Sequence, residues 1–473
     1  MYIEPYRNMK ENITRREFIR RSVAATVLPS LAGCGSNDGK DEATGEMTFR
    51  TNPKTGEKVS ILGYGCMRWP MTKDDQGNEI IDQQQVNLLV DTALENGINY
   101  FDAAPVYLSG HCEKATGEAL SRHPRDSYFI ATKLSNFGDS STETAMKMYR
   151  ESLENFNTDY IDYYLLHAIG GGGMETFNRR FVDNGMMDFL LEEREKGHIR
   201  NLGFSFHGDK ASFDEFMKLH DKYHWDFVQI QLNYMDWKHP SGRNTAAEYL
   251  QGELDKRGIP SIIMEPLLGG SLAKVPSHIV EKMKERKPLA SVASWAFRFA
   301  GSHEGVLTVL SGMTYMDHLK DNIQTFSPLQ PLSDDELEFL EEIAVLMKKY
   351  PTVPCTGCNY CMPCPYGLDI PALLRHYNKC VNEGFITADS AIDSSSDSSS
   401  DSSNGSANSS SRRDYRRARR AFLASYMMEI DPYRTADRCI SCGQCRPLCP
   451  QGINIPGEMG KIWTYVEKLV TEN

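Results

Sequence analysis

Between residues 48 and 330, short apolar runs alternate with longer amphipathic segments. Several of the short runs are almost continuously apolar, which is typical of parallel strands that are buried on both faces. The longer segments repeat their apolar positions at helical spacing, as in Gln83–Asn96, which Gly97 ends. We therefore predict eight strands: Val59–Gly65, Asn99–Ala104, Tyr128–Leu134, Tyr160–Ala168, Ile199–Phe206, Phe227–Asn233, Ser261–Pro266 and Gly305–Gly312.

Strand and helix alternate eight times, which predicts an α/β fold of the (β/α)8 TIM-barrel type. The alternative is an open, doubly wound sheet, whose first turn normally carries the pattern Gly-x-Gly-x-x-Gly. The segment Leu62–Met67, at the end of the first predicted strand, reads LGYGCM and lacks the third glycine. The barrel is therefore our prediction for residues 48–330.

A second, smaller domain follows the predicted barrel. The segment Asp334–Lys349 has apolar residues along one face and predicts a connecting helix within residues 331–350. We expect residues 351–473 to form a small α-rich domain. Serine dominates residues 389–413, a composition that cannot build a core and predicts disorder. An arginine-rich segment ends this insert and continues to Arg420.

Composition narrows the classes of function. The 473 residues carry a formal net charge of -12, and this acidic balance argues against a nucleic-acid binder, which normally presents a basic face. No apolar run is long enough to cross a bilayer as a mature helix. The 12 cysteines indicate disulfides if the protein is exported and metal binding if it is cytosolic, so their spacing must decide.

The first residues resemble an export signal. Two adjacent arginines in the segment TRREFIR, residues 14–20, precede a modest apolar segment that ends at Cys34. This pattern is similar to a twin-arginine signal joined to a lipoprotein signal, which implies export to the cell envelope and a lipid anchor on Cys34 as the sole contact with a membrane. The alternative is a basic N-terminal helix on a cytoplasmic protein. Residues 35–47 are polar and predict a tether.

Four chemically useful residues lie at or just after the carboxyl ends of predicted strands, where the active sites of such barrels form. They are Asp102, Tyr107, Lys133 and His167. A tyrosine has an ordinary pKa of about 10, so we expect the ammonium of Lys133 to lower the pKa of Tyr107. We expect Asp102 to hold Lys133 charged and His167 to donate a hydrogen bond to a carbonyl oxygen. Together these groups would polarise and protonate a carbonyl group.

The segments NYFDAAPVY (99–107), ATK (131–133) and DYIDYYLLH (159–167) resemble the aldo-keto reductases. The resemblance extends over essentially the whole barrel. It implies that Asp102, Tyr107, Lys133 and His167 form a catalytic tetrad, that the substrate is a small carbonyl compound or alcohol, and that NAD(P) carries the hydride. Taken singly, each residue also has a structural explanation, such as a helix cap or a satisfied core histidine.

The same resemblance implies a dinucleotide site, with some departures from the family pattern. Phe206 stands where an asparagine is expected, and Met264 stands where an aromatic residue is common. Gly312 and His318 replace a lysine and an arginine that grip a 2′-phosphate, so the choice between NAD and NADP stays open. The implied contacts are Ser205, Gln229, Leu267, Gly269, Gly270, Ser311, Gly312, His318, Asp321 and Asn322.

Eight cysteines form two compact runs, each closed by a proline. They resemble a bacterial dicluster ferredoxin, in which the last cysteine of each run ligates the other cluster. The resemblance implies two [4Fe–4S] clusters, one on Cys355, Cys358, Cys361 and Cys449, and one on Cys439, Cys442, Cys445 and Cys364. The first run has two residues rather than three before its last cysteine, which leaves the exchange of that ligand open. Zinc and disulfides are the alternatives.

Two functions are consistent with these features. The first is an aldo-keto reductase-like oxidoreductase, whose barrel exchanges hydride between NAD(P) and a small carbonyl or alcohol substrate. Its two clusters would relay electrons to or from a redox partner protein. The second is an iron–sulfur electron-transfer or sensing protein that uses the barrel as a scaffold.

Overall fold

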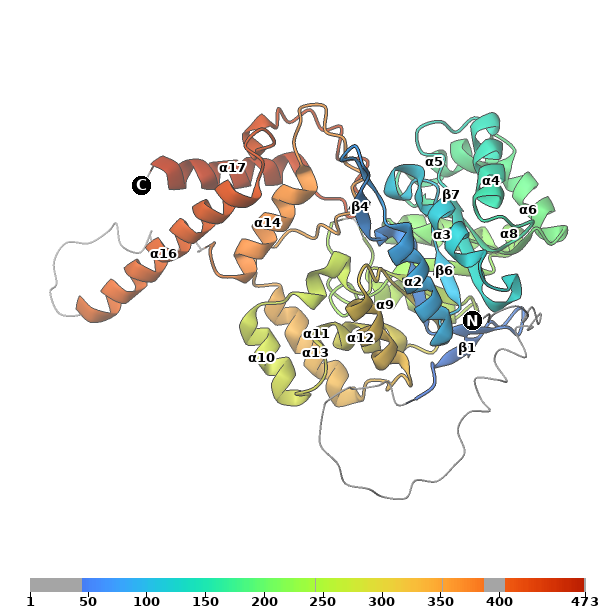
Figure 1. The fold of residues 1–473 in the computed structure, drawn as a ribbon, viewed down its shortest axis with the longest axis horizontal. Coiled ribbons are helices and arrows are strands. Elements are labelled where there is room, and N and C mark those ends of the chain that lie inside the picture. The colour runs from blue at the N-terminus through green and yellow to red at the C-terminus, as the bar shows by residue number, and fades with distance from the viewer. Residues whose placement is uncertain (1–44, 243, 351, 387–404, 472–473) are drawn as a thin grey trace, which may run out of the picture.

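The computed structural model describes residues 45–242, 244–350, 352–386 and 405–471 (Figure 1). The predicted export signal with Cys34, most of the tether and residues 389–404 of the serine-rich insert lie outside the described residues. No helix in the described ranges is both long and apolar enough to cross a membrane.

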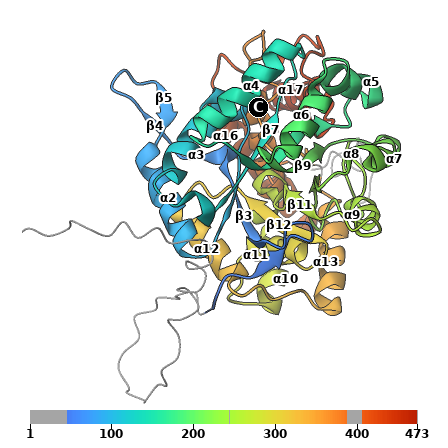
Figure 2. The same cartoon turned by 90° about the vertical axis from the view of Figure 1, so that its right-hand side faces the viewer.

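Eight parallel strands close into a barrel, with helices around it (Figure 2). The order around the barrel is β10-β11-β12-β3-β6-β7-β8-β9, so every chain neighbour is also a neighbour in space. This confirms the predicted (β/α)8 barrel. The strands are β3 (Leu62–Gly65), β6 (Tyr100–Asp102), β7 (Phe129–Leu134), β8 (Ile161–Ile169), β9 (Ile199–Phe206), β10 (Phe227–Gln231), β11 (Ser261–Met264) and β12 (Val306–Ser311).

The first predicted strand, Val59–Gly65, divides into two elements. Its first part, β2 (Lys58–Ser60), pairs antiparallel with β1 (Phe49–Thr51) in a hairpin outside the barrel, and only β3 joins the barrel. A second hairpin, β4 (Met71–Lys73) and β5 (Glu79–Ile81), follows β3. Sequence patterning did not predict β1, β4 or β5, because these strands have only three residues each and none of these residues is buried.

Amphipathic helices surround the strands, as predicted, and their apolar faces form one large buried core with the outer faces of the strands. A separate buried cluster lies among the strands themselves and includes Tyr100, Phe129, Tyr163 and Phe227. The helices are α2 (Gln83–Glu95), α3 (Cys112–Leu120), α4 (Thr142–Asn155), α5 (Gly173–Phe177), α6 (Met186–Glu195), α7 (Lys210–Lys218), α8 (His220–Tyr223), α9 (Ala247–Asp255), α10 (Ser277–Arg286), α11 (Val292–Gly301) and α12 (Met316–Phe326).

The inward-facing positions explain where the chemistry lies. Side chains alternate between the two faces of a strand, so every second residue points into the barrel. On β8 the buried interior residues Tyr163 and Leu165 lead to His167, and on β7 Phe129 and Ala131 lead to Lys133. The last inward position of β7 and of β8 therefore carries a polar group at the carboxyl end of the barrel.

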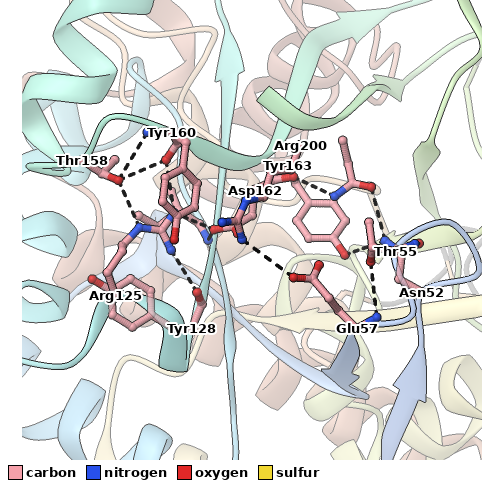
Figure 3. Close-up of polar contacts among 12 residues, drawn as sticks. Asn52, Thr55, Glu57, Arg125, Tyr128, Thr158, Tyr160, Asp162, Tyr163 and Arg200 are labelled. Atoms are coloured by element: carbon pink, nitrogen blue, oxygen red, sulfur yellow. Dashed lines mark hydrogen bonds and ion pairs between the residues drawn. The ribbon is translucent and has the colours of Figure 1, made fainter. Parts of the chain in front are cut away.

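A polar network closes the opposite end of the barrel (Figure 3). Asp162 is fully buried and accepts hydrogen bonds from the amide of Ile130 at 2.9 Å, from Arg125 at 2.7 Å and from Arg200 at 3.1 Å. In the β1–β2 turn, Asn52 donates a hydrogen bond to the hydroxyl of Tyr163 at 2.9 Å. The hairpin thus covers the amino-terminal ends of β8 and β9.

The predicted connecting helix is α13 (Asp334–Met347). It begins with a capping box formed by Ser333 and Glu336. The same Glu336 forms an ion pair with the buried Arg298 of α11 at 2.8 Å, and this pair fixes α13 against the barrel. The second domain contains α14 (Ile370–Asn382), α16 (Gly405–Glu429) and α17 (Ile455–Thr471), which pack around their own hydrophobic core and lie on the left of Figure 1. Residues 405–413, predicted to be disordered, belong to α16.

We predict that Asp162→Asn destabilises the barrel without affecting its carboxyl end. An asparagine can still accept from Ile130, but it cannot form ion pairs with Arg125 and Arg200. Because the two guanidinium groups are partly exposed, we expect a loss of about 2 kcal/mol in the free energy of unfolding. Urea denaturation followed by tryptophan fluorescence measures this loss, and the exposed Asp75→Asn is the control. An unchanged midpoint would contradict the role assigned to this network.

Candidate functional site

The four polar residues predicted at the strand ends lie together at the carboxyl end of the barrel. Asp102 ends β6, Lys133 lies on β7 and His167 on β8, while Tyr107 begins a short 3-10 turn after β6. The ammonium of Lys133 donates hydrogen bonds to Asp102 at 2.6 Å and to the carbonyl of Ala103 at 2.7 Å. The same ammonium lies 5.0 Å from the ring centroid of Tyr107. The structure therefore brings all four side chains into one cluster.

Burial dominates the electrostatics of this cluster. It raises the pKa of Asp102, and the neighbouring Lys133 opposes this shift. It also raises the pKa of Tyr107 well above 10, with smaller contributions from Tyr360 and Asp102. The pKa of Tyr107 is therefore raised in this structure, whereas we expected it to be lowered, because the cost of burying a phenolate dominates. Tyr107 is a neutral hydrogen-bond donor at physiological pH.

His167 is held as a neutral ring. Burial lowers its pKa well below 6.5, and the nearby charges of Lys133 and Arg180 lower it further. Its Nδ1 lies 2.5 Å from the hydroxyl of Ser135, and Arg180 donates to its backbone carbonyl at 2.8 Å. When the Ser135 hydroxyl donates to Nδ1, the ring proton resides on Nε2, which faces the mouth of the barrel.

One residue of this cluster comes from the second domain and was not predicted from the sequence. Tyr360 lies between Cys358 and Cys361, and its hydroxyl is 3.4 Å from Nε2 of His167. A hydrogen bond also joins the hydroxyls of Tyr107 and Tyr360. The ring of Tyr360 lies beside Phe137, with 6.2 Å between ring centroids. No local pattern marks this tyrosine, because its position depends on how the two domains dock.

A cleft of about 1710 Å³ opens between the barrel and the second domain. On the barrel side it reaches Tyr107, Phe137 and the loop after β8 that contains Gly171 and Gly172. On the other side it is lined by Tyr360 and by the residues around Cys358. The cleft gives a small molecule a route to Tyr107.

The residues expected to hold a dinucleotide lie along β9 to α12, in two groups. At the nicotinamide end, Gln229 is buried and its Oε1 lacks a hydrogen-bond partner among the described residues, whereas Ser205 accepts from the amide of Ala168 at 2.8 Å. At the adenosine end, Asn322 donates to Ser311 at 2.8 Å. The remaining members of this end are the exposed Gly312 and His318, and Asp321, which accepts from Ser291.

The loop expected to hold the pyrophosphate, with Leu267, Gly269 and Gly270, contacts the second domain. A Cβ atom on Gly269 would collide with the Cα of Thr356. The carboxylate of Glu265 accepts from the amide of Gly269 at 2.6 Å, and Arg68 donates to the carbonyl of Thr356 at 2.5 Å. The buried, unpaired oxygen of Gln229 fits an amide donor of a nicotinamide. The covered loop does not fit a pyrophosphate in this arrangement.

The eight clustered cysteines divide into two sets. Electrostatic interactions join Cys449 to Cys355, Cys358 and Cys361 of the first run. Cys364 interacts instead with Cys445, which also interacts with Cys439 and Cys442. The ferredoxin resemblance implies the same grouping, with Cys449 beside the first run and Cys364 beside the second. Ligation of two clusters by these sets stays a prediction.

The donor chemistry fits iron–sulfur clusters, because each set offers four thiols. In the described ranges, no three or more histidine, cysteine or acidic side chains surround a single point as ligands of one ion would. A [4Fe–4S] cluster takes one thiolate on each of four irons, so its ligands lie further apart than those of a single ion. We call the predicted ligands Cys355, Cys358, Cys361 and Cys449 the near set, because Tyr360 lies between two of them and reaches the barrel.

Comparison with known proteins agrees with this division. Residues 61–345 match the Aldo/keto reductase family, and residues 354–455 match the 4Fe-4S dicluster domain. The chain is 24% identical over 326 residues to L-galactose dehydrogenase of Arabidopsis thaliana, covering 64% of this chain and 95% of that protein. It is 26% identical over 313 residues to an uncharacterized oxidoreductase of Bacillus subtilis (strain 168), covering 60% and 92%.

Among solved structures, the chain is similar to the holo form of an aldo-keto reductase from Bacillus halodurans. The TM-score is 0.50 at 23% identity, and the match covers 63% of this chain and 96% of that one. This likeness supports the barrel fold of the first domain.

We predict that the two ligand sets can be separated by double substitution. Cys449→Ser and Cys355→Ser should each halve the iron content, and the double variant should lose no more, because both residues ligate the same cluster. Cys364→Ser combined with Cys449→Ser should remove both clusters. Iron analysis and electron paramagnetic resonance of anaerobically purified protein check this. An additive loss from the first pair would contradict the exchanged ligation.

We predict that His167 makes folding sensitive to acid. The unfolded chain protonates this ring below a pH of about 6.5, but the folded chain does not, so wild-type stability falls as the pH drops below that value. His167→Gln removes this contribution, which amounts to about 1.4 kcal/mol at one pH unit below the unfolded pKa. Urea midpoints at neutral and acidic pH measure it. His318→Gln, at an exposed position, is the control. If this variant changes the pH dependence of stability as much as His167→Gln does, the burial of His167 is not the cause.

Proposed function

Because the chain belongs to the aldo/keto reductase family and carries a 4Fe-4S dicluster domain, we propose that it is an oxidoreductase that interconverts a small carbonyl compound and its alcohol. In the finer form of this proposal, hydride is exchanged with NAD(P), and two [4Fe–4S] clusters transfer electrons between the barrel and a redox partner protein. The observation that carries the proposal is the cluster of Tyr107, Lys133 and His167 at the end of an open cleft.

Each side chain of this cluster has its own role toward a carbonyl substrate. Tyr107 donates a hydrogen bond and then a proton to the carbonyl oxygen, and it recovers the proton in the reverse direction. The ammonium of Lys133 stabilises the phenolate that remains, and Asp102 keeps this ammonium in place. His167, as a neutral ring, donates a second hydrogen bond to the same oxygen and stabilises its developing charge.

A bound nicotinamide dinucleotide would supply or accept the hydride. The partnerless oxygen of Gln229 supports binding of the carboxamide, and Ser311 with Asn322 supports the adenosine end. While Thr356 lies on Gly269, the pyrophosphate cannot lie on its loop, so binding requires the segment that carries Thr356 to move away.

A second candidate function is supported by that same contact. If the segment stays in place, the barrel serves as a scaffold and the iron–sulfur domain alone transfers electrons or senses the redox state. The two candidates differ in whether Tyr107 matters for turnover.

The experiment uses anaerobic, cluster-loaded protein with NADH or NADPH and 4-nitrobenzaldehyde. We expect Tyr107→Phe to lower kcat about 10²- to 10⁴-fold, because the proton donor is lost, while cluster content stays unchanged. Tyr366→Phe, a matched change in the iron–sulfur domain, should have no effect. Nucleotide oxidation and the visible absorption of the clusters are recorded together. Failure of both nucleotides to bind, with Tyr107→Phe unchanged in electron transfer, would favour the scaffold function.

Export to the cell envelope is also a proposal, supported by the twin-arginine pattern and Cys34 alone. Twin-arginine export carries folded proteins, which agrees with clusters that are inserted before transport.

A further inference from the structure

Tyr360 brings an oxygen atom from the iron–sulfur domain to the reactive end of the barrel. Its hydroxyl lies 3.4 Å from Nε2 of His167 and forms a hydrogen bond with the hydroxyl of Tyr107. Tyr107 and His167 lie next to each other, with 5.9 Å between their ring centroids, so the hydroxyl of Tyr360 contacts both side chains at one place. One oxygen thus faces two donors.

Those two donors are the groups that a substrate carbonyl oxygen would use. A neutral His167 with its proton on Nε2 and a neutral Tyr107 both point hydrogen-bond donors at one position. Each has a single proton to offer there, so it cannot serve the Tyr360 oxygen and a substrate oxygen at full strength together. The two oxygens compete for one site.

The ring of Tyr360 also occupies space at that site. It lies beside Phe137, at 6.2 Å between centroids, and edge-on to His167 at 6.3 Å. Both Tyr360 and Phe137 line the cleft through which a small molecule reaches Tyr107. A flat carbonyl compound would place its ring where the phenol ring now lies and its oxygen where the hydroxyl now lies.

The position of Tyr360 is fixed from both sides. It lies between two ligands of the near set, Cys358 and Cys361, and four residues before it Thr356 is buried and its carbonyl accepts from Arg68 at 2.5 Å. In this arrangement the phenol is therefore attached to a loop that contacts the barrel, and displacing the phenol requires that loop to move, as nucleotide binding does.

We propose that Tyr360 occupies the carbonyl-oxygen site of the barrel, and that a substrate binds by displacing its hydroxyl from Tyr107 and His167. This inference rests on the proposed function, because it requires those two residues to bind the substrate oxygen. It makes the iron–sulfur domain part of the substrate site and makes Tyr360 a determinant of affinity.

The test compares the binding of 4-nitrobenzaldehyde to four cluster-loaded full-length proteins by equilibrium dialysis: wild type, Tyr360→Phe, Tyr366→Phe and Tyr107→Phe. Tyr360→Phe keeps the ring and removes the competing oxygen, so we expect binding to become roughly three- to tenfold tighter, as the loss of one or two net hydrogen bonds predicts. In turnover, KM should fall by a similar factor and kcat should not fall. Tyr366 is exposed and should leave binding unchanged.

The outcomes separate the inference from the proposed function. If Tyr360→Phe leaves binding unchanged or weakens it while Tyr107→Phe weakens it, the substrate uses Tyr107 without displacing Tyr360, and the inference is overturned alone. A fall in kcat at constant affinity would instead make Tyr360 a catalytic group and also overturn it. If Tyr107→Phe changes neither binding nor turnover, the proposed function fails and the inference fails with it.

Discussion

The buried ammonium of Lys133 is the constraint on which the reactive end of the barrel depends. A charge removed from water is tolerated only with close partners, and here they are Asp102 at 2.6 Å and the carbonyl of Ala103 at 2.7 Å. Both partners follow from the pairing of β6 with β7, which places Asp102 beside Ala131. Burial lowers the pKa of His167, and this charge lowers it further, so the ring stays neutral.

The second domain adds a different constraint, because it lies on the same end of the barrel. Thr356 packs on Gly269, and Gln451 exchanges hydrogen bonds with Gln231 at 2.9 and 3.3 Å. The carboxylate of Glu265 accepts from the amide of Gly269, a donor that an incoming phosphate would need. The domain therefore covers the loops that a dinucleotide would use, and the cleft beside Tyr107 stays open.

Much of this arrangement could be predicted from local pattern. Side chains alternate between the two faces of a strand, so the last inward residue of β7 or β8 is determined once the strand is found. The two cysteine sets were implied by the ferredoxin resemblance, because the first run departs from the usual spacing. Tyr360 could not be found this way, because its role arises from contact between residues nearly two hundred positions apart, 3.4 Å from His167. The pKa of Tyr107 was also mispredicted, because spacing shows which charge is near but not how completely the phenol is buried.

The near set and the domain interface are built from the same two segments. The first segment carries Thr356 and Tyr360, which contact the barrel and lie among Cys355, Cys358 and Cys361. The second segment carries Cys449 and, two residues later, Gln451, which also contacts the barrel. One cluster bound by both segments would fix their relative position, since each thiolate is attached to the same rigid inorganic core. The barrel loop that would bind a pyrophosphate faces these two segments, whose relative position such a cluster would fix. Tyr107 and the cysteines of the near set therefore lie at one interface between the two domains, so the carbonyl chemistry and the electron transfer that we propose would take place side by side.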